Sequence, residues 1–151
     1  MSFPINESVE ARIREINDAL QLLRNIVAKD FDELTIYERL SARYLIIQLV
    51  EAAASVCVRV LLRVYNETAE GYPECFMRLG LKGVLPEDLA SKLASVARLR
   101  NLLVQRSWTT VDRKVYESAK KSLKDFEEFV THVRGFLQSG GNARVERIKI
   151  A

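Results

Sequence analysis

The chain has 151 residues, of which 48% are hydrophobic, and its 23 basic residues stand against 20 acidic ones. This length and apolar content predict one globular domain with a sizeable core. The nearly balanced charge excludes a protein that coats nucleic acid nonspecifically, although it leaves room for one local phosphate site. The sequence does not open with a basic segment followed by an apolar one, as a signal peptide would, and polar residues interrupt its most apolar stretch. We therefore expect a cytoplasmic protein without a membrane span.

The sequence contains no cluster of metal ligands and no glycine-rich phosphate loop, so we expect neither a metal nor a cofactor. Its two cysteines, Cys57 and Cys75, lie in apolar, helical contexts without the spacing of metal ligands. In a reducing cytoplasm such residues are expected to be free thiols in the core.

The first predicted helix runs from near Asn6, whose side chain can cap it, to about Ala28. Its apolar residues recur at alternating steps of four and three, which is typical of a seam that packs along another helix. The seam consists of Val9, Ile13, Ile16, Leu20, Leu23 and Val27. We expect it to pack inside the bundle, with contact to a second copy of the chain as the alternative.

The second predicted helix begins near Ile36, because Thr35 and Glu38 have the spacing of a capping box, and it continues to about Tyr65. Most positions from 45 to 64 are apolar, which predicts a helix buried around most of its circumference. A narrow polar line interrupts this surface at Gln48, Glu51, Ser55, Arg59 and Arg63. Glu51 and Arg59 either line a functional cleft together with Arg100 or belong to a structural seam that is solvated or paired.

Pro73 and Gly80 predict a short third helix, and Pro86 precedes a fourth that reaches the region of Gln105. Apolar residues along this fourth helix follow steps of three and four, which place Arg100 beside the apolar face. A guanidinium directed toward such a surface needs an anion or other acceptors, since burying it alone is expensive.

The last predicted helix begins at Asp112 and ends around 138–141. It carries the only histidine, His132, which we expect at the surface beside the core stripe; a catalytic role is the alternative. Residues 1–141 are predicted to form the helical domain, and residues 142–151 a basic tail. The expected fold is an all-α, up-and-down bundle of four long helices with one short inserted helix.

Positive charge is concentrated around the end of the fourth helix. Between positions 98 and 114 there are five basic residues and one acid, on a chain whose total charge is +3. The basic residues are Arg98, Arg100, Arg106, Arg113 and Lys114. This concentration favours a phosphate-bearing partner such as RNA.

The residues from Arg100 to Trp108 resemble the signature of the HEPN superfamily, in the branch paired with minimal nucleotidyltransferases. That signature reads Arg, usually Asn, three further residues, His, one further residue and Tyr. The chain has Arg100 and Asn101, but Gln105 in place of the histidine and Ser107 in place of the tyrosine. The resemblance extends over most of the chain and implies the same helical fold.

The resemblance also implies an activity and partners. Family members with the full signature are metal-independent endoribonucleases, act as homodimers with both signatures in one cleft, and serve as toxins restrained by a nucleotidyltransferase antitoxin. By this likeness Arg100 would clamp the scissile phosphate and Asn101 would position the clamp. Gln105 has no accessible protonation change, so it cannot replace the histidine as a general acid or base.

Other residues of this stretch have expected binding roles. Arg106 and Arg113 would contribute to phosphate or RNA binding, and Trp108 would stack a base or pack in an interface. In the family, the nucleotidyltransferase partner modifies the tyrosine at this position of the signature. Ser107 retains a hydroxyl there, but the serine side chain is shorter than that of tyrosine.

Three functions remain open from the sequence. The first is a HEPN toxin subunit whose ribonuclease activity is weak or lost because of Gln105 and Ser107. The second is a non-catalytic companion that presents substrate or nucleotide to a nucleotidyltransferase. The third is a helical dimerisation module without a ligand. An adjacent open reading frame for a short nucleotidyltransferase would separate the first two functions from the third.

Overall fold

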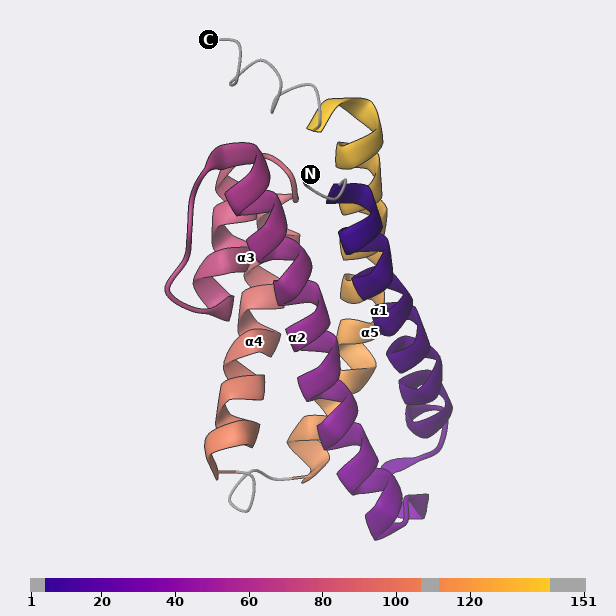
Figure 1. The fold of residues 1–151 in the computed structure, drawn as a ribbon. Helices are drawn as coiled ribbons and strands as arrows, with labels where there is room; N and C mark the ends of the chain where they lie inside the picture. Colours follow the sequence, from indigo (N-terminus) through magenta and orange to yellow (C-terminus); the bar gives the residue numbers. More distant parts are fainter. Residues whose placement is uncertain (1–4, 107–111, 142–151) are drawn as a thin grey trace, which may run out of the picture.

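The computed structural model describes residues 5–106 and 112–141, and these residues form an all-α fold, as predicted. These residues contain four long helices and one short one, and Figure 1 shows how they are arranged. The helices are α1 (Ile5–Val27), α2 (Ile36–Tyr65), α3 (Tyr72–Leu81), α4 (Glu87–Arg106) and α5 (Asp112–Phe136). A 3-10 turn, η1 (Phe31–Glu33), precedes α2, and a π-helical turn, η2 (Leu137–Gly141), follows α5. The predicted basic tail, 142–151, lies outside the described residues.

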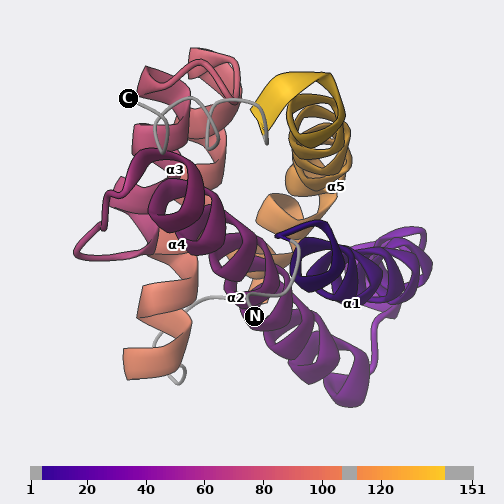
Figure 2. The ribbon, with the colours of Figure 1, turned by 45° about the horizontal axis from the view of Figure 1, so that its top comes forward.

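Helix α2 forms the centre of the bundle. In both views of the ribbon it passes between the pair α1 and α5 and the pair α3 and α4 (Figures 1 and 2). The predicted seam of α1 is buried inside the chain, as Val9, Ile13, Ile16 and Leu23 are each 0% exposed. The intramolecular packing of this seam is therefore confirmed.

By length and composition α2 is also apolar enough to cross a membrane. However, 61% of its most apolar window is buried within the bundle, and the core helix of a globular protein passes the same test. Ala53 and Ala54 are completely buried, and their small side chains let neighbouring helices approach closely. The hydrophobicity of α2 is thus explained largely by its place in the core.

The start of α2 follows the predicted capping chemistry. The Glu38 N–H donates to Thr35 Oγ1 over 3.1 Å, and the Thr35 N–H donates to Glu38 Oε1 over 3.0 Å, which completes the capping box. At the other end Asn66 adopts a left-handed conformation with φ of 54°, which asparagine tolerates better than most residues. These two features set the length of the central helix.

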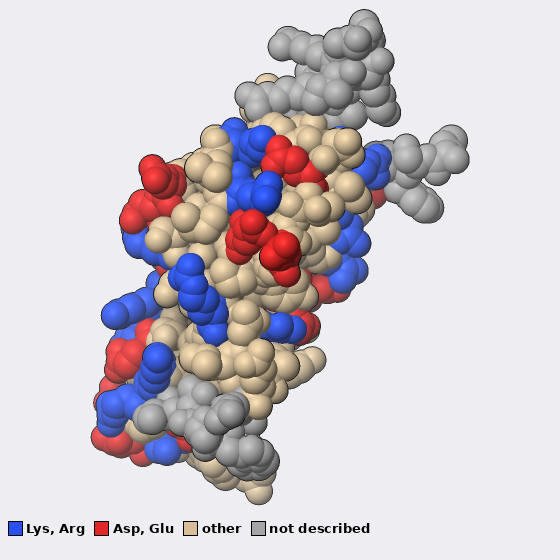
Figure 3. Space-filling view, turned by 90° about the vertical axis from the view of Figure 1, so that its left-hand side faces the viewer, with Lys and Arg blue, Asp and Glu red and all other residues tan. Residues whose placement is uncertain are grey.

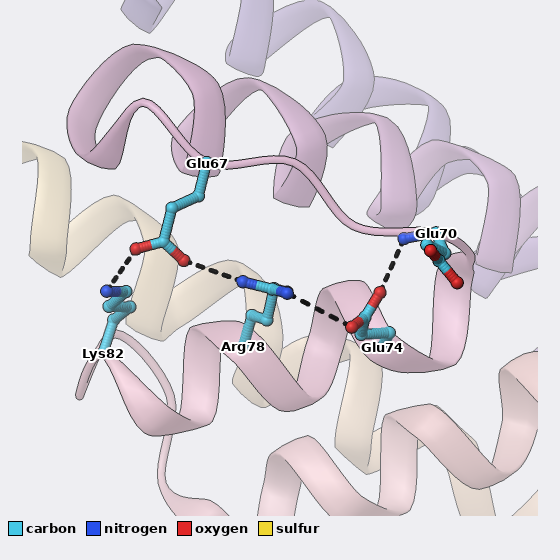
Figure 4. Close-up of polar contacts among 5 residues, drawn as sticks. All are labelled: Glu67, Glu70, Glu74, Arg78 and Lys82. Atoms are coloured by element: carbon cyan, nitrogen blue, oxygen red, sulfur yellow. Dashed lines mark hydrogen bonds and ion pairs between the residues drawn. The ribbon is translucent and has the colours of Figure 1, made fainter.

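Helix α3 lies close against α4 because Gly80 has no side chain. A Cβ at position 80 would lie only 2.7 Å from the Ala90 Cβ. On its outer side α3 is joined to the preceding connection by an ionic network (Figure 4). Arg78 donates to Glu67 over 3.0 Å and to Glu74 over 3.3 Å, and Lys82 pairs with Glu67.

The expectation of free thiols is wrong in this structure. Cys57 in α2 and Cys75 in α3 are joined by a disulfide, and both residues are at most 1% exposed. The prediction treated each cysteine separately, whereas the fold brings α3 back along α2 and places the two Cα atoms 6.2 Å apart.

Candidate functional site

Arg100 lies where α4 faces both α2 and α3. Its Nη2 donates to Glu51 Oε1 over 2.6 Å, and its Nη1 donates to Asn101 Oδ1 over 3.1 Å. The guanidinium carbon also lies 4.8 Å from the centre of the Tyr72 ring, which is the geometry of a cation–π contact. Three elements of the bundle therefore hold one arginine side chain.

This guanidinium is half-buried but not saturated by protein groups. The Arg100 side chain is 19% exposed, and its Nε is buried without a hydrogen-bond partner among the described residues. Nε and Nη2 form a donor edge of the kind that holds carboxylate or phosphate oxygens bidentately. Glu51, which is 46% exposed, engages only one donor of that edge. An anion with more oxygens has a chemical reason to compete with it.

Tyr72 was not among the residues predicted from the sequence. Gly71 is the N-cap of α3 and Pro73 lies in the first turn, so Tyr72 is fixed at the start of a short helix. A proline at this place preorganises the turn. The sequence gives a signal for this helix start, but nothing in it indicates that the ring faces Arg100, because that contact depends on how α3 packs beside α4.

The two residues of the polar line on α2 have different neighbours. Glu51 contacts Arg100, as the cleft hypothesis requires. Arg59 donates to the Ser55 hydroxyl and carbonyl one turn earlier on the same helix, the latter over 3.1 Å. Within the described part of the chain no contact joins Arg59 to Arg100, so its cleft-lining role stays a prediction.

The remaining signature residues are only partly described. Gln105 is exposed in the last turn of α4. Ser107, Trp108 and the side chain of Arg106 lie outside the described residues. Their predicted roles remain expectations.

Arg113 lies in the first turn of α5 and is directed toward η1. Its Nη2 is 3.4 Å from Asp32 Oδ1, and its guanidinium lies 4.5 Å from the centre of the Phe31 ring. The neighbouring Asp112 accepts a hydrogen bond of 2.8 Å from Arg43 Nε of α2. The structure therefore anchors the start of α5 to α2 and η1, and the described contacts of Arg113 do not include Arg100.

His132 lies at the other end of α4 from Arg100. It lines a shallow groove with Gly83 and Val84, which precede α4, and with residues of the last turns of α5. Arg100 lies near the C-terminal end of α4. This separation gives no support to the alternative that His132 substitutes for the missing histidine of the signature.

An apolar stripe of exposed residues, interrupted by Gln48, Glu51 and Ser55, lies on one face of α2, together with a residue one turn beyond Arg100 on α4. Its members are Leu40, Tyr44, Val58 and Leu62 of α2 and Val104 of α4, each between 47% and 59% exposed. Glu51 lies in the middle of this stripe by helical position. Figure 3 views the molecule from the side of α3 and α4, where basic and acidic side chains are spread over the face among areas of uncharged surface.

Comparison with known proteins places the fold in a family. The model of the family described as Ribonuclease HepT-like matches residues 14–133. No curated protein matches the sequence significantly.

Solved structures of low sequence identity have the same fold. A tri-AMPylated HEPN toxin of Shewanella oneidensis, in complex with an MNT antitoxin, is 15% identical with a TM-score of 0.78, over 89% of this chain and 99% of that one. The cytosolic protein YutE of Bacillus subtilis, of unknown function, is 16% identical with a TM-score of 0.79, over 92% and 94%. A chain of a toxin–antitoxin crystal structure with AMP-PNP is 16% identical with a TM-score of 0.76, over 84% and 97%.

The family match covers well over half of the sequence, including Arg100 and Asn101, and the structural matches span nearly the whole of each similar chain. Both agree with the resemblance that the signature residues indicated. The chain therefore belongs to the Ribonuclease HepT-like family of HEPN proteins.

Proposed function

We propose that this protein is the HEPN-type toxin subunit of a toxin–antitoxin pair, with a minimal nucleotidyltransferase as its antitoxin and with weak or absent ribonuclease activity. Membership in the Ribonuclease HepT-like family supports the toxin assignment. The similar structures that contain an MNT antitoxin support the kind of partner. The observation that carries the proposal is the partly saturated Arg100 guanidinium, held by Glu51, Asn101 and Tyr72.

The expected chemistry follows from what this site contains and what it lacks. Arg100 can hold the scissile phosphate and stabilise the charge that develops on it. Gln105 cannot exchange a proton with the attacking 2′-hydroxyl or with the leaving oxygen. General acid–base catalysis contributes about 10²–10⁴-fold, so its loss removes about 3–5.5 kcal/mol of barrier lowering. RNA binding without rapid cleavage is the expected behaviour.

A homodimer is part of the proposal. The apolar stripe on α2 and Val104 flank Arg100 with side chains that are about half exposed. Exposed apolar side chains gathered on one face of a helix are typical of an interaction site. If two copies associate through the stripe about a two-fold axis, their Arg100 residues face one shared cleft. The similarity to a cytosolic protein supports a cytoplasmic location for this assembly.

The test is RNA cleavage without metal ions. Purified protein is incubated with a mixed RNA pool in the presence of a chelator, beside the variant Arg100→Ala and the double variant Gln105→His, Ser107→Tyr. We expect little cleavage by the wild type, increased cleavage by the double variant, and none when Arg100→Ala is added to it. Vigorous wild-type cleavage that Arg100→Ala abolishes would show that the acid–base requirement has been misjudged.

The toxin assignment itself is tested by growth. Expression of the double variant in a bacterial host is expected to slow growth, and co-expression of the adjacent nucleotidyltransferase to restore it. No gain in either cleavage or toxicity would argue instead for the non-catalytic companion, which the exposed Gln105 at the end of α4 favours.

A further inference from the structure

A polar groove lies between α4 and α5, on another face of α4 from Arg100. Its volume is about 500 Å³, within the range of about 300–1,000 Å³ typical of small-molecule sites. From α4 it is lined by Lys92, Ser95, Val96 and Leu99. Arg100 follows Leu99 by one residue and is thus rotated by about 100° around the helix. The groove is therefore separate from the site formed with Glu51.

Three lysines line this groove: Lys92 from α4, and Lys121 and Lys124 from α5. Lys92 pairs with Asp88 over 3.1 Å and Lys124 with Glu128 over 3.7 Å, each one turn away on its own helix. Such exposed ion pairs contribute little to stability, so a phosphate can replace the carboxylate in them easily. Lys121 has no ion pair with any residue that the structure describes and offers its ammonium to a ligand directly.

The floor of the groove is apolar and its wall contains small hydroxyl residues. Val96 and Leu99 are 9% and 6% exposed and present hydrocarbon to the hollow. Ser118 and Ser122 lie opposite on α5, and their small size leaves the space open. An aromatic base can lie against such a floor while a phosphate reaches the lysines at the rim.

Asp125 supplies the remaining recognition group. It lines the same groove, and burial raises the pKa of its carboxyl, while the nearby Lys92 acts in the opposite direction. A partly buried carboxylate is stabilised by an N–H donor. The exocyclic amino group of a nucleic-acid base is such a donor; uracil lacks this group and has only its ring N3–H as a donor on that edge.

We propose that the groove between α4 and α5 binds an amino-bearing nucleotide, with its phosphate on Lys121 and Lys92, its base against Val96 and Leu99, and its amino group on Asp125. The ligand is either a free nucleotide or one residue of an RNA strand. The proposal does not depend on RNA cleavage or on Arg100.

Isothermal titration of the full chain with AMP, UMP and inorganic phosphate tests this site. We expect AMP to bind more tightly than UMP, and UMP more tightly than phosphate. Lys121→Ala should weaken AMP binding about threefold to tenfold, whereas the matched control Lys120→Ala, one residue away on an exposed position, should leave it unchanged. Asp125→Asn should reduce the preference for AMP over UMP.

The same variants in a titration with a short single-stranded adenine-rich RNA identify the source of the nucleotide. Loss of RNA affinity in Lys121→Ala supports a groove that holds part of a strand. Unchanged RNA affinity with weakened AMP binding supports a site for a free nucleotide. The proposal is wrong if AMP does not bind at millimolar concentration, if Lys120→Ala and Lys121→Ala have equal effects, or if Arg100→Ala alone abolishes AMP binding.

Discussion

The pairing of Arg100 with Glu51 places a protein carboxylate on the donor edge that the proposed RNA phosphate would use. The two side chains are 19% and 46% exposed, and the contact joins Nη2 to Oε1 over 2.6 Å. A phosphate bound there has to replace this carboxylate or share the guanidinium with it. Glu51 therefore sets how available Arg100 is to an anion.

Glu51→Gln is expected to strengthen RNA binding at Arg100, because the amide competes less well for the guanidinium and a negative charge is removed from the site. An ion pair with this exposure is worth about 0.2–1 kcal/mol, so affinity should rise by up to about fivefold. Fluorescence anisotropy with a labelled short RNA measures the change. Glu7→Gln, at the exposed start of α1, removes the same charge elsewhere and serves as the control. Weaker binding by Glu51→Gln alone would mean that Glu51 positions the clamp.

At this scale the sequence predicted the polar partners of the site but not its aromatic one. Arg100 and Glu51 could be found because their places in two helical periodicities put each on the boundary of an apolar face. The contact of Tyr72 depends on the tertiary placement of a ten-residue helix. No local pattern encodes that placement, and the same holds for the groove beside Lys121.

The close approach of α3 and α4 depends on a missing side chain. A methyl group at Gly80 would come within 2.7 Å of the Ala90 Cβ, and neither group can rotate away. Gly80→Ala should therefore lower the free energy of unfolding by about 1–3 kcal/mol, as overpacking does. The exposed Gly135 in α5 has nothing within 4 Å of its added Cβ, so Gly135→Ala should raise stability by about 0.5–1 kcal/mol. Urea unfolding of both variants decides the matter; equal stabilisation by the two would refute the steric argument.

The ionic network around α3 makes stability depend on acidity. A hydrogen bond from Lys82 holds the pKa of Glu67 below its ordinary value of 4.5, and the Glu70 N–H does the same for the pKa of Glu74. Since ionisation is favoured in the folded state, the stabilisation is fully present above about pH 4.5. It disappears as the pH falls through the lowered folded-state pKa.

Thermal unfolding followed by circular dichroism between pH 7 and pH 3 tests this dependence. The melting temperature of Glu67→Gln should lie below that of the wild type at pH 7, and the two should converge toward pH 3. Glu117→Gln, an exposed residue without an ion pair in the described part of the chain, should show no such convergence. A gap for Glu67→Gln that persists at pH 3 would attribute its effect to packing.

The order and bounds of the helices were largely predictable, because caps and apolar periodicity are local. The predicted start of α2 at Ile36 agrees with the structure, and so does its end at Tyr65. The first helix was predicted to end one residue late, and its predicted cap, Asn6, lies inside α1, which already includes Ile5. In contrast, the disulfide between Cys57 and Cys75 joins two helices whose contact no local pattern specifies.

Association of two copies belongs to the scale of the whole molecule. We expect the wild type to sediment as a dimer at micromolar concentration, because Leu40, Tyr44, Val58 and Leu62 expose apolar side chains on one face of α2. Tyr44→Glu would bury a charge in that interface and should give a monomer. Leu81→Glu, on α3 and 83% exposed, changes the charge outside the stripe and should remain dimeric. A monomeric wild type would contradict the proposal that the Arg100 residues of two copies face one shared cleft.

Helix α2 supplies both the innermost packing of the bundle and the outer stripe, from one uninterrupted run of 30 residues. Insertion or deletion of a single amino acid within it would turn every later position by about 100°. The buried residues of α2 would then lose their packing partners, and the exposed stripe would at the same time face another direction. We therefore expect natural length variation in the connections at 28–35 and 66–71, while α2 changes only by substitution.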